Sequence, residues 1–346
     1  MWMGTMEGAA MAEEVADAES GLRIGLSLTG VAQQPRDGDM GPLLETLLGT
    51  VRRARELGFD HIHAGQLFMS RYQTLQPLPL LSRLAHEAGG MRLVGTILLP
   101  LYHPVALAES LASLDWISEG RLTLSVRGYR STEFSAFGAT DRHASARMTE
   151  CLRCLMALWS GDPVTFHGAH YRLDGVRVGL RPRQRPHPPV WFAASTDRGV
   201  RRAARLGLPW HVGPFADRGT VVRQVELYRS EARHPHLALP LAREVCCADT
   251  HAEAVRIAAR YLAGMYAGRA GWGRRTDPHG LADSFSELSR GRFVIGSPEE
   301  CAEQLREYLG LGIGTLHVRL SWPGMPAELE RRSETLFAER VAPRLR

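Results

Sequence analysis

Two short segments of this chain combine the residue types that bind anionic groups. In the first, Arg127 offers a planar fork of N–H donors to a phosphate, and Gly128 lets a ligand approach the backbone closely. In the second, Ala194, Ser195 and Thr196 stand between an apolar run and a helical pattern. Backbone N–H groups and hydroxyls at the positive end of a helix attract anions. Together the segments predict an anion-binding site.

This pattern has a purely structural alternative. Ser195 or Thr196 would then only cap the helix that follows, and Arg127 would pair with Glu133. The residue types alone leave both interpretations open.

Histidines suggest a second kind of chemistry. His61 and His63 form an HxH pattern on an expected strand, which is how some metal-dependent hydrolases offer two imidazoles from one face, and His211 and His317 would extend the set. That mechanism also needs a carboxylate at the end of the last strand, where this sequence has Arg319. A metal-dependent hydrolase is therefore disfavoured, and we expect no metal.

Composition excludes several other classes. The 346 residues are 44% hydrophobic and 23% charged, with a net charge of +5, and all basic side chains other than histidine are Arg because the sequence has no Lys, which rules out Schiff-base chemistry through Lys. The Arg residues are scattered, which disfavours nucleic-acid binding. No apolar run approaches the roughly 20 residues that span a bilayer, and residues 1–20 lack the pattern of a secretory signal. We expect a cytoplasmic protein without membrane contact.

The five cysteines do not form a disulfide or zinc framework. Cys151 and Cys154 make a single CxxC inside a helical pattern, where residues three apart simply share a face.

Alternation of short β-rich runs with amphipathic helices indicates the scaffold. Eight strands are expected, at residues 22–28, 59–64, 92–100, 121–126, 190–194, 209–213, 244–248 and 314–320. This pattern predicts an α/β fold, a (β/α)₈ TIM barrel over residues 21–346 after a disordered extension at 1–20. Residues 160–189 predict a hairpin insertion after the fourth helix, and residues 268–292 a long excursion before the last strand. Chemistry in such barrels lies at the carboxyl ends of the strands.

Longer motifs identify a family. The segment from Leu99 to Gly138, LPLYHPVALAESLASLDWISEGRLTLSVRGYRSTEFSAFG, resembles the bacterial luciferase-like flavin-dependent monooxygenases. The similarity continues through SARMTE from Ser145, AASTDRGVRRAARLGLPW from Ala193 and GSPEECAEQL from Gly296, and so covers nearly all of the chain beyond residue 22.

The resemblance implies a function. Reduced FMN from a separate flavin reductase would bind at the barrel mouth, with its phosphate on Arg127 and Ser195 and with Thr196 secondary. Dioxygen would add at flavin C4a, and the hydroperoxide would transfer one oxygen to a small but bulky organic substrate, in keeping with secondary metabolism. The Arg127–Gly128 pair favours FMN over the deazaflavin F420. The resemblance also implies a homodimer.

One position departs from the family pattern. Luciferase relatives carry a carboxylate–His pair after the second strand, whereas this sequence has Gly65 and Gln66. A Gln can hydrogen-bond a flavin edge or a peroxide but cannot act as a general base. The candidate catalytic residues are therefore Gln66 as a donor, with the base sought among His63, His211, Tyr102 and Tyr129.

Two other functions stay open. One is an F420-dependent dehydrogenase that transfers hydride, and the other is a non-catalytic flavin-binding partner subunit. Aromatic residues near strand ends would suit a bulky substrate: Phe68, Tyr72, Tyr102, Trp191 and Trp272.

Overall fold

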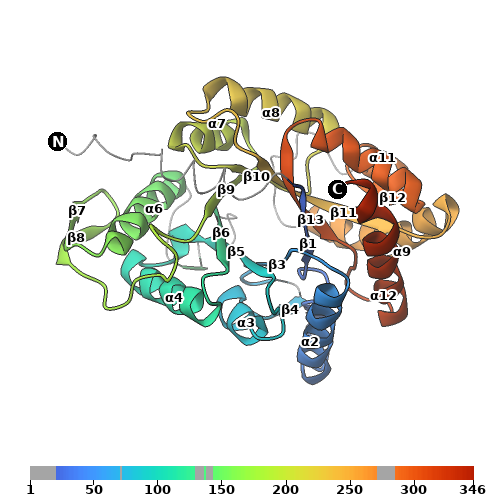
Figure 1. Cartoon of the computed structure of the whole chain (residues 1–346), viewed down its shortest axis with the longest axis horizontal. Coiled ribbons are helices and arrows are strands. Elements are labelled where there is room, and N and C mark those ends of the chain that lie inside the picture. The colour runs from blue at the N-terminus through green and yellow to red at the C-terminus, as the bar shows by residue number, and fades with distance from the viewer. Residues whose placement is uncertain (1–20, 71, 129–135, 138–142, 271–284) are drawn as a thin grey trace.

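Eight parallel strands close into a barrel (Figure 1). The computed structural model describes residues 21–70, 72–128, 136–137, 143–270 and 285–346. In ring order the strands are β1 (Arg23–Ser27), β3 (His61–Gly65), β5 (Arg92–Leu98), β6 (Leu122–Arg127), β9 (Val190–Ala194), β10 (Trp210–Val212), β11 (Leu239–Cys247) and β13 (Ile313–Arg319). Pairing of β13 with β1, and of β10 with β11, completes the ring. The predicted (β/α)₈ barrel is confirmed.

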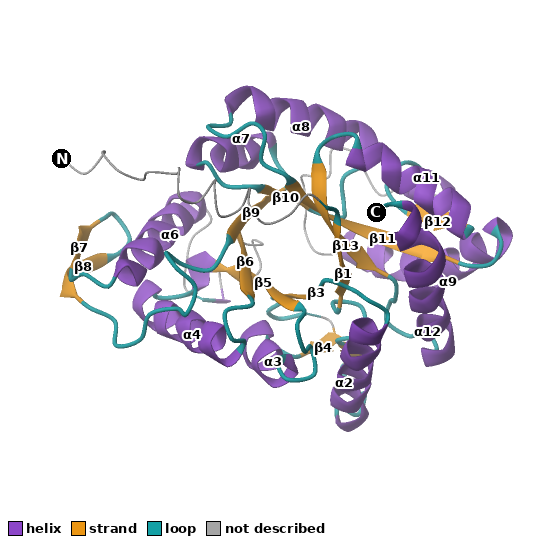
Figure 2. Cartoon of the chain, viewed as in Figure 1, coloured by secondary structure: helices purple, strands orange, loops and turns teal. Residues whose placement is uncertain are grey.

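Helices surround this barrel on the outside (Figure 2). They are α2 (Gly41–Glu56), α3 (Pro77–Leu84), α4 (Pro104–Ile117), α6 (Ala144–Ser160), α7 (Asp197–Leu206), α8 (Arg218–Glu231), α9 (His251–Ala270), α10 (Phe285–Ser289), α11 (Pro298–Leu309) and α12 (Ala327–Leu336). Apolar strand residues such as Leu26, Ile62 and Leu124 face this layer and are at most 2% exposed. Their burial between strands and helices supplies the main core.

The two predicted insertions have different outcomes. The hairpin is confirmed, because β7 (Val164–His167) and β8 (Arg172–Val176) pair antiparallel. The excursion is shorter than predicted: α9 continues to Ala270, and α10 and the buried Arg292 belong to the packed structure. Residues 271–284 and the predicted extension at 1–20 lie outside the described residues.

Three elements differ from the expected strands. The seventh barrel strand begins at Leu239 rather than Glu244, and its outer end pairs with a short unpredicted strand, β12 (Val294–Gly296). Another unpredicted pair, β2 (Gln33–Pro35) and β4 (Tyr72–Thr74), joins the loops after β1 and β3. Within the described ranges no helix combines the length and the apolarity that a membrane span requires.

Helix α12 carries a buried carboxyl group that makes stability depend on pH. Burial and the nearby negative charge of Glu334 raise the pKa of Glu330 to about 7, from 4.5. The folded chain therefore holds a proton between pH 4.5 and 7 that the unfolded chain releases, so this contribution to stability is full at low pH and is lost as the pH rises through 7.

Replacing Glu330 with Gln should remove that pH dependence. We expect Glu330→Gln to raise the free energy of unfolding at pH 8 by on the order of 2 kcal/mol, and by much less at pH 5. Urea unfolding at both pH values measures this. The matched control is Glu328→Gln, an exposed position on the same helix. Equal effects of Glu330→Gln at the two pH values would show that this carboxyl group is not the cause.

Candidate active site

The two predicted anion-binding segments lie side by side at the barrel mouth. Arg127 is the last residue of β6 and is in register with Ala193 of the neighbouring strand β9. Ser195 and Thr196 connect β9 to α7, so the start of this helix adjoins the Arg127 strand end. The fold thus brings together residues that are about 70 positions apart in the sequence.

The start of α7 suits an anion. Thr196 caps the helix, its hydroxyl accepting from the Gly199 N–H at 3.3 Å, while the exposed Ser195 hydroxyl makes no bond within the described residues. The capping alternative therefore holds for Thr196. A Cβ at position 199 would lie 2.7 Å from the Ala194 Cβ, so Gly199 allows the helix start to pack directly on the strand end. The first N–H groups of a helix need partners from outside it.

Helix α7 also begins with an acidic residue, Asp197, but the charge of its carboxylate is paired with Arg223 of α8. The Asp197 carboxylate accepts two bonds from the Arg223 guanidinium, at 2.7 and 2.9 Å, and one from Gln224 at 2.9 Å. The Arg223 bond is the main reason that the pKa of Asp197 falls to about 2. The carboxylate is thus held against α8, where its repulsion of a ligand at the helix start is offset.

Gly128, directly after β6, leaves space for a ligand. A Cβ at this position would meet only the Met148 sulfur, at 3.9 Å, which is ordinary contact. Packing within the described protein therefore does not require glycine here. The proposed pairing of Arg127 with Glu133, and the candidate base Tyr129, fall outside the described residues.

Four histidines fill the barrel lumen below the mouth. His63 is bonded at both ring nitrogens, to Ser27 at 3.1 Å and to Thr96 at 2.8 Å. His61 bonds His317 at 2.7 Å, and His211 bonds Ser125 at 2.6 Å. The Trp191 ring lies 5.3 Å from the His317 ring.

Burial keeps these imidazoles neutral. It lowers the pKa of His61 and of His211 to about 3, and the pKa values of His63 and His317 fall well below 6.5 for the same main reason. A general base works best with a pKa near the working pH, so this environment does not favour His63 or His211 in that role. No cluster of three His, Cys, Asp or Glu side chains in the described part of the chain has metal-binding geometry.

Gln66 acts as a clamp on a neighbouring tyrosine. Its Oε1 accepts from the Leu98 N–H at 2.9 Å, and its Nε2 donates to the Tyr102 hydroxyl oxygen and to Gln76 Oε1 at 3.3 Å. Gln66 is only 2% exposed, and Nε2 of its amide already donates to two acceptors within the protein. Among the described residues the Tyr102 hydroxyl accepts from Gln66 and donates to no acceptor, and burial raises its pKa.

The backbone of Tyr102 is held as well. The Tyr171 hydroxyl, from the hairpin insertion, donates to the Tyr102 carbonyl oxygen at 3.0 Å and accepts from Arg147 Nε at 3.1 Å. Tyr102 is therefore fixed by side chains from two separate parts of the chain, Gln66 and Tyr171. Neither Gln76 nor Tyr171 belongs to a sequence motif, so their part in this arrangement could not be predicted from the sequence.

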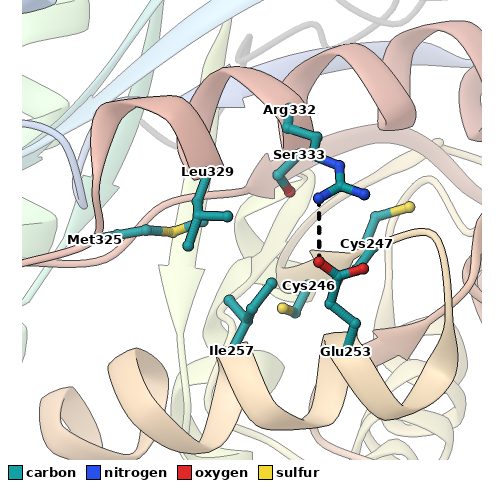
Figure 3. A pocket seen from close by; sticks show the side chains of 9 residues that line it. Cys246, Cys247, Glu253, Ile257, Met325, Leu329, Arg332 and Ser333 are labelled. Carbon is teal, nitrogen blue, oxygen red and sulfur yellow. Dashed lines mark hydrogen bonds and ion pairs between the residues drawn. The ribbon is translucent and has the colours of Figure 1, made fainter.

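A small pocket lies away from this site. It opens between α9 and α12 beside the outer end of β11, where Arg332 pairs with Glu253 at 3.1 Å (Figure 3). Its lining residues are Cys246, Cys247, Ala248, Glu253, Ile257, Met325, Leu329, Arg332 and Ser333. None of them was predicted as a site residue.

Comparison with known proteins establishes the family. The fold defines a (β/α)₈ barrel with Arg127 and Ser195 at its carboxyl-end mouth, and the profile described as luciferase-like monooxygenase matches residues 24–315. The chain belongs to the luciferase-like monooxygenase family.

Relatives in this family use more than one cofactor. The chain is 27% identical to the oxygenase component of the flavin-dependent trigonelline monooxygenase of Acinetobacter baylyi, over 75% of this chain and 79% of that protein. It is 26% identical to an F420-dependent glucose-6-phosphate dehydrogenase of Beutenbergia cavernae, over 94% and 98%. Two uncharacterized proteins of Sinorhizobium fredii match at 33% and 32% identity, but the match spans only about half of their length.

Solved structures support the same fold. The monooxygenase RslO1 of Streptomyces bottropensis superposes with a TM-score of 0.81 and 25% identity, covering 93% of this chain and 99% of that one. A type II Baeyer–Villiger monooxygenase component of Pseudomonas putida, solved with FMN, has a TM-score of 0.74 at 18% identity, covering 94% and 99%. Homologues of this chain therefore include flavin-dependent monooxygenases and F420-dependent oxidoreductases.

Proposed function

We propose that this chain is the oxygenase component of a two-component monooxygenase, which uses reduced FMN from a flavin reductase and O₂ to oxidise a bulky organic substrate. The observation that carries the proposal is the junction of the Arg127 strand end with the start of α7. Support for FMN and for a reductase comes from relatives named as an oxygenase component and as an FMNH₂-dependent monooxygenase of Pseudomonas putida.

The residues at the mouth fit the FMN phosphate. Arg127 would supply charged N–H donors, Ser195 and the first N–H groups of α7 would supply neutral ones, and Gly128 would leave room for the ribityl chain. An isoalloxazine anchored in this way would lie over the barrel lumen. Reduced FMN, when bound, supplies the activation of O₂.

The protein would contribute orientation and a proton donor. The Tyr102 hydroxyl is fixed by Gln66 and donates to no acceptor among the described residues, so it can donate a hydrogen bond or a proton to an oxygen atom that gains charge. The neutral histidines in the lumen would give the ring an uncharged surface to lie on. In this proposal Gln66 acts through Tyr102, since its own N–H groups already have acceptors.

Product labelling under ¹⁸O₂ tests the activity. With reduced FMN supplied by a flavin reductase, products from a panel of aromatic substrates and cyclic ketones should gain one labelled oxygen atom. Tyr102→Phe should lower the labelled yield by about a hundredfold, because a proton donor in the reaction is lost. FMN affinity should stay the same in that variant and serves as the control.

Titrations with F420 test the second candidate function, which the nearly full-length match to F420-dependent dehydrogenases favours. Tight binding of F420, hydride transfer and no oxygen consumption would replace the monooxygenase proposal. Binding of reduced FMN without either reaction would instead indicate a non-catalytic partner subunit.

A further inference from the structure

A second guanidinium stands at the barrel mouth, across from the first. Arg319 is the last residue of β13, as Arg127 is of β6, and these two strands are four places apart in the ring of eight. They are therefore diametrically opposed. The phosphate proposal uses Arg127 and leaves Arg319 without a function.

Arg319 faces the lumen. Side chains two apart on a strand point to the same side, and His317 packs against the lumen histidines. The positive charge of Arg319 is also one of the causes that lower the pKa of His63, whose side chain lies in the lumen. Only 8% of the Arg319 side chain is exposed.

One edge of this guanidinium is fixed by the protein. Its Nη1 donates to Glu244 Oε1 at 2.6 Å, and the same carboxylate accepts from Trp322 Nε1 at 2.7 Å and from the Tyr266 hydroxyl at 3.2 Å. Glu244 is fully buried, so these three donors hold it in place. The carboxylate in turn sets the position of Arg319.

The remaining edge of the guanidinium makes no hydrogen bond to the described residues. Arg319 Nε is buried and has no partner among them, which is costly for a charged donor. Arg–carboxylate pairs are frequently bidentate, whereas this pair uses only Nη1 of Arg319. The bond through a single nitrogen leaves donors at the mouth for a ligand.

We propose that Arg319 binds the anionic edge of reduced FMN, the N1 atom and C2 carbonyl of its isoalloxazine. This inference rests on the proposed function. A flavin whose phosphate lay at the β6 and β9 ends could direct its ring across the mouth toward β13, which is opposite β6 in the ring of strands. Reduced isoalloxazine is a monoanion near neutral pH, with its charge over N1 and the C2 oxygen, whereas the oxidised ring is neutral. A cation there favours the reduced form that the reaction requires.

Anaerobic titrations with oxidised and reduced FMN test this role. Arg319→Met should weaken the binding of reduced FMN by about tenfold or more and that of oxidised FMN by less than about threefold, since only the reduced ring loses a charged partner. The midpoint potential of bound FMN should fall by about 30 mV for each tenfold change in this ratio, as a two-electron couple requires.

Two further variants keep the test decisive. The double substitution Arg319→Met with Glu244→Gln removes both charges of the buried pair, and so avoids a lone buried carboxylate if the single variant fails to fold. Arg243→Met is the matched control: Arg243 is also buried and also has guanidinium nitrogens without a partner among the described residues. It lies on the opposite face of β11 from Glu244, however, and stacks on the Tyr308 ring at 4.6 Å. It should leave the ratio of the two affinities unchanged.

The possible outcomes separate this inference from the proposed function. If the unaltered protein binds FMN but the ratio is the same after Arg319→Met and after the double substitution, the role of Arg319 is overturned and the phosphate site stands. If neither form of FMN binds to the unaltered protein, the proposed function itself fails.

Discussion

Replacing Arg127 with Met is expected to weaken FMN binding by about 10- to 100-fold, the effect of losing a charged hydrogen bond to a phosphate. At the junction of β6 and α7, Arg127 carries the only positive charge that we propose for the phosphate, so no other side chain would replace it. The negative charge of Asp197 is already paired with Arg223. Equilibrium titration by flavin fluorescence measures the change.

Riboflavin provides the internal control for this prediction. It lacks the phosphate, so Arg127→Met should change its affinity little, and the preference of the protein for FMN over riboflavin should largely disappear. Arg172→Met, on the exposed hairpin, is the matched variant and should change neither affinity. A loss of riboflavin binding as large as the loss of FMN binding would mean that Arg127 supports the fold or the ring, and not the phosphate.

Gly30→Ala is expected to lower the free energy of unfolding by about 3 kcal/mol or more, because the added methyl group cannot be accommodated. Gly30 follows β1, and a Cβ at this position would lie 1.9 Å from the Ser321 carbonyl oxygen and 2.7 Å from its carbonyl carbon. Both are backbone atoms, so relief requires moving the loop after β13. The contact joins the first and last barrel strands at the mouth.

Urea unfolding measures this loss, with Gly49→Ala as the matched control. Gly49 lies in α2, where an added Cβ meets nothing within 4 Å. Removing a glycine from a helix interior should raise stability by about 1 kcal/mol. Similar behaviour of the two variants would show that the close contact at Gly30 is not a constraint in the folded protein.

Much of the barrel could be predicted from the sequence because its strands are short apolar runs set between amphipathic helices. The prediction of strand bounds is least accurate where charged residues or proline occur within an apolar run. Pro240 and Arg243 interrupt the apolar pattern of β11, so the start of that strand was placed too late. Strands of three residues, such as β12, carry too few residues to show a period.

Some features of the candidate site could also be predicted from the sequence, and others could not. Local rules were sufficient for the α7 start, since a Thr before a helix predicts a cap and a strand end predicts the barrel mouth. Contacts between distant residues were not accessible: nothing in the sequence indicates that Gln66 bonds Tyr102, or that Glu244 holds Arg319. The role foreseen for Gln66 as a direct donor to the cofactor remains a prediction, although its N–H groups have acceptors in the protein.

A crystal structure of the protein with bound FMN tests the central proposal most directly. We expect the phosphate within hydrogen-bond distance of the Arg127 guanidinium and of the first N–H groups of α7, with the ring over the lumen. A phosphate bound at another strand end, with Arg127 and Ser195 making no contact to it, would contradict the account.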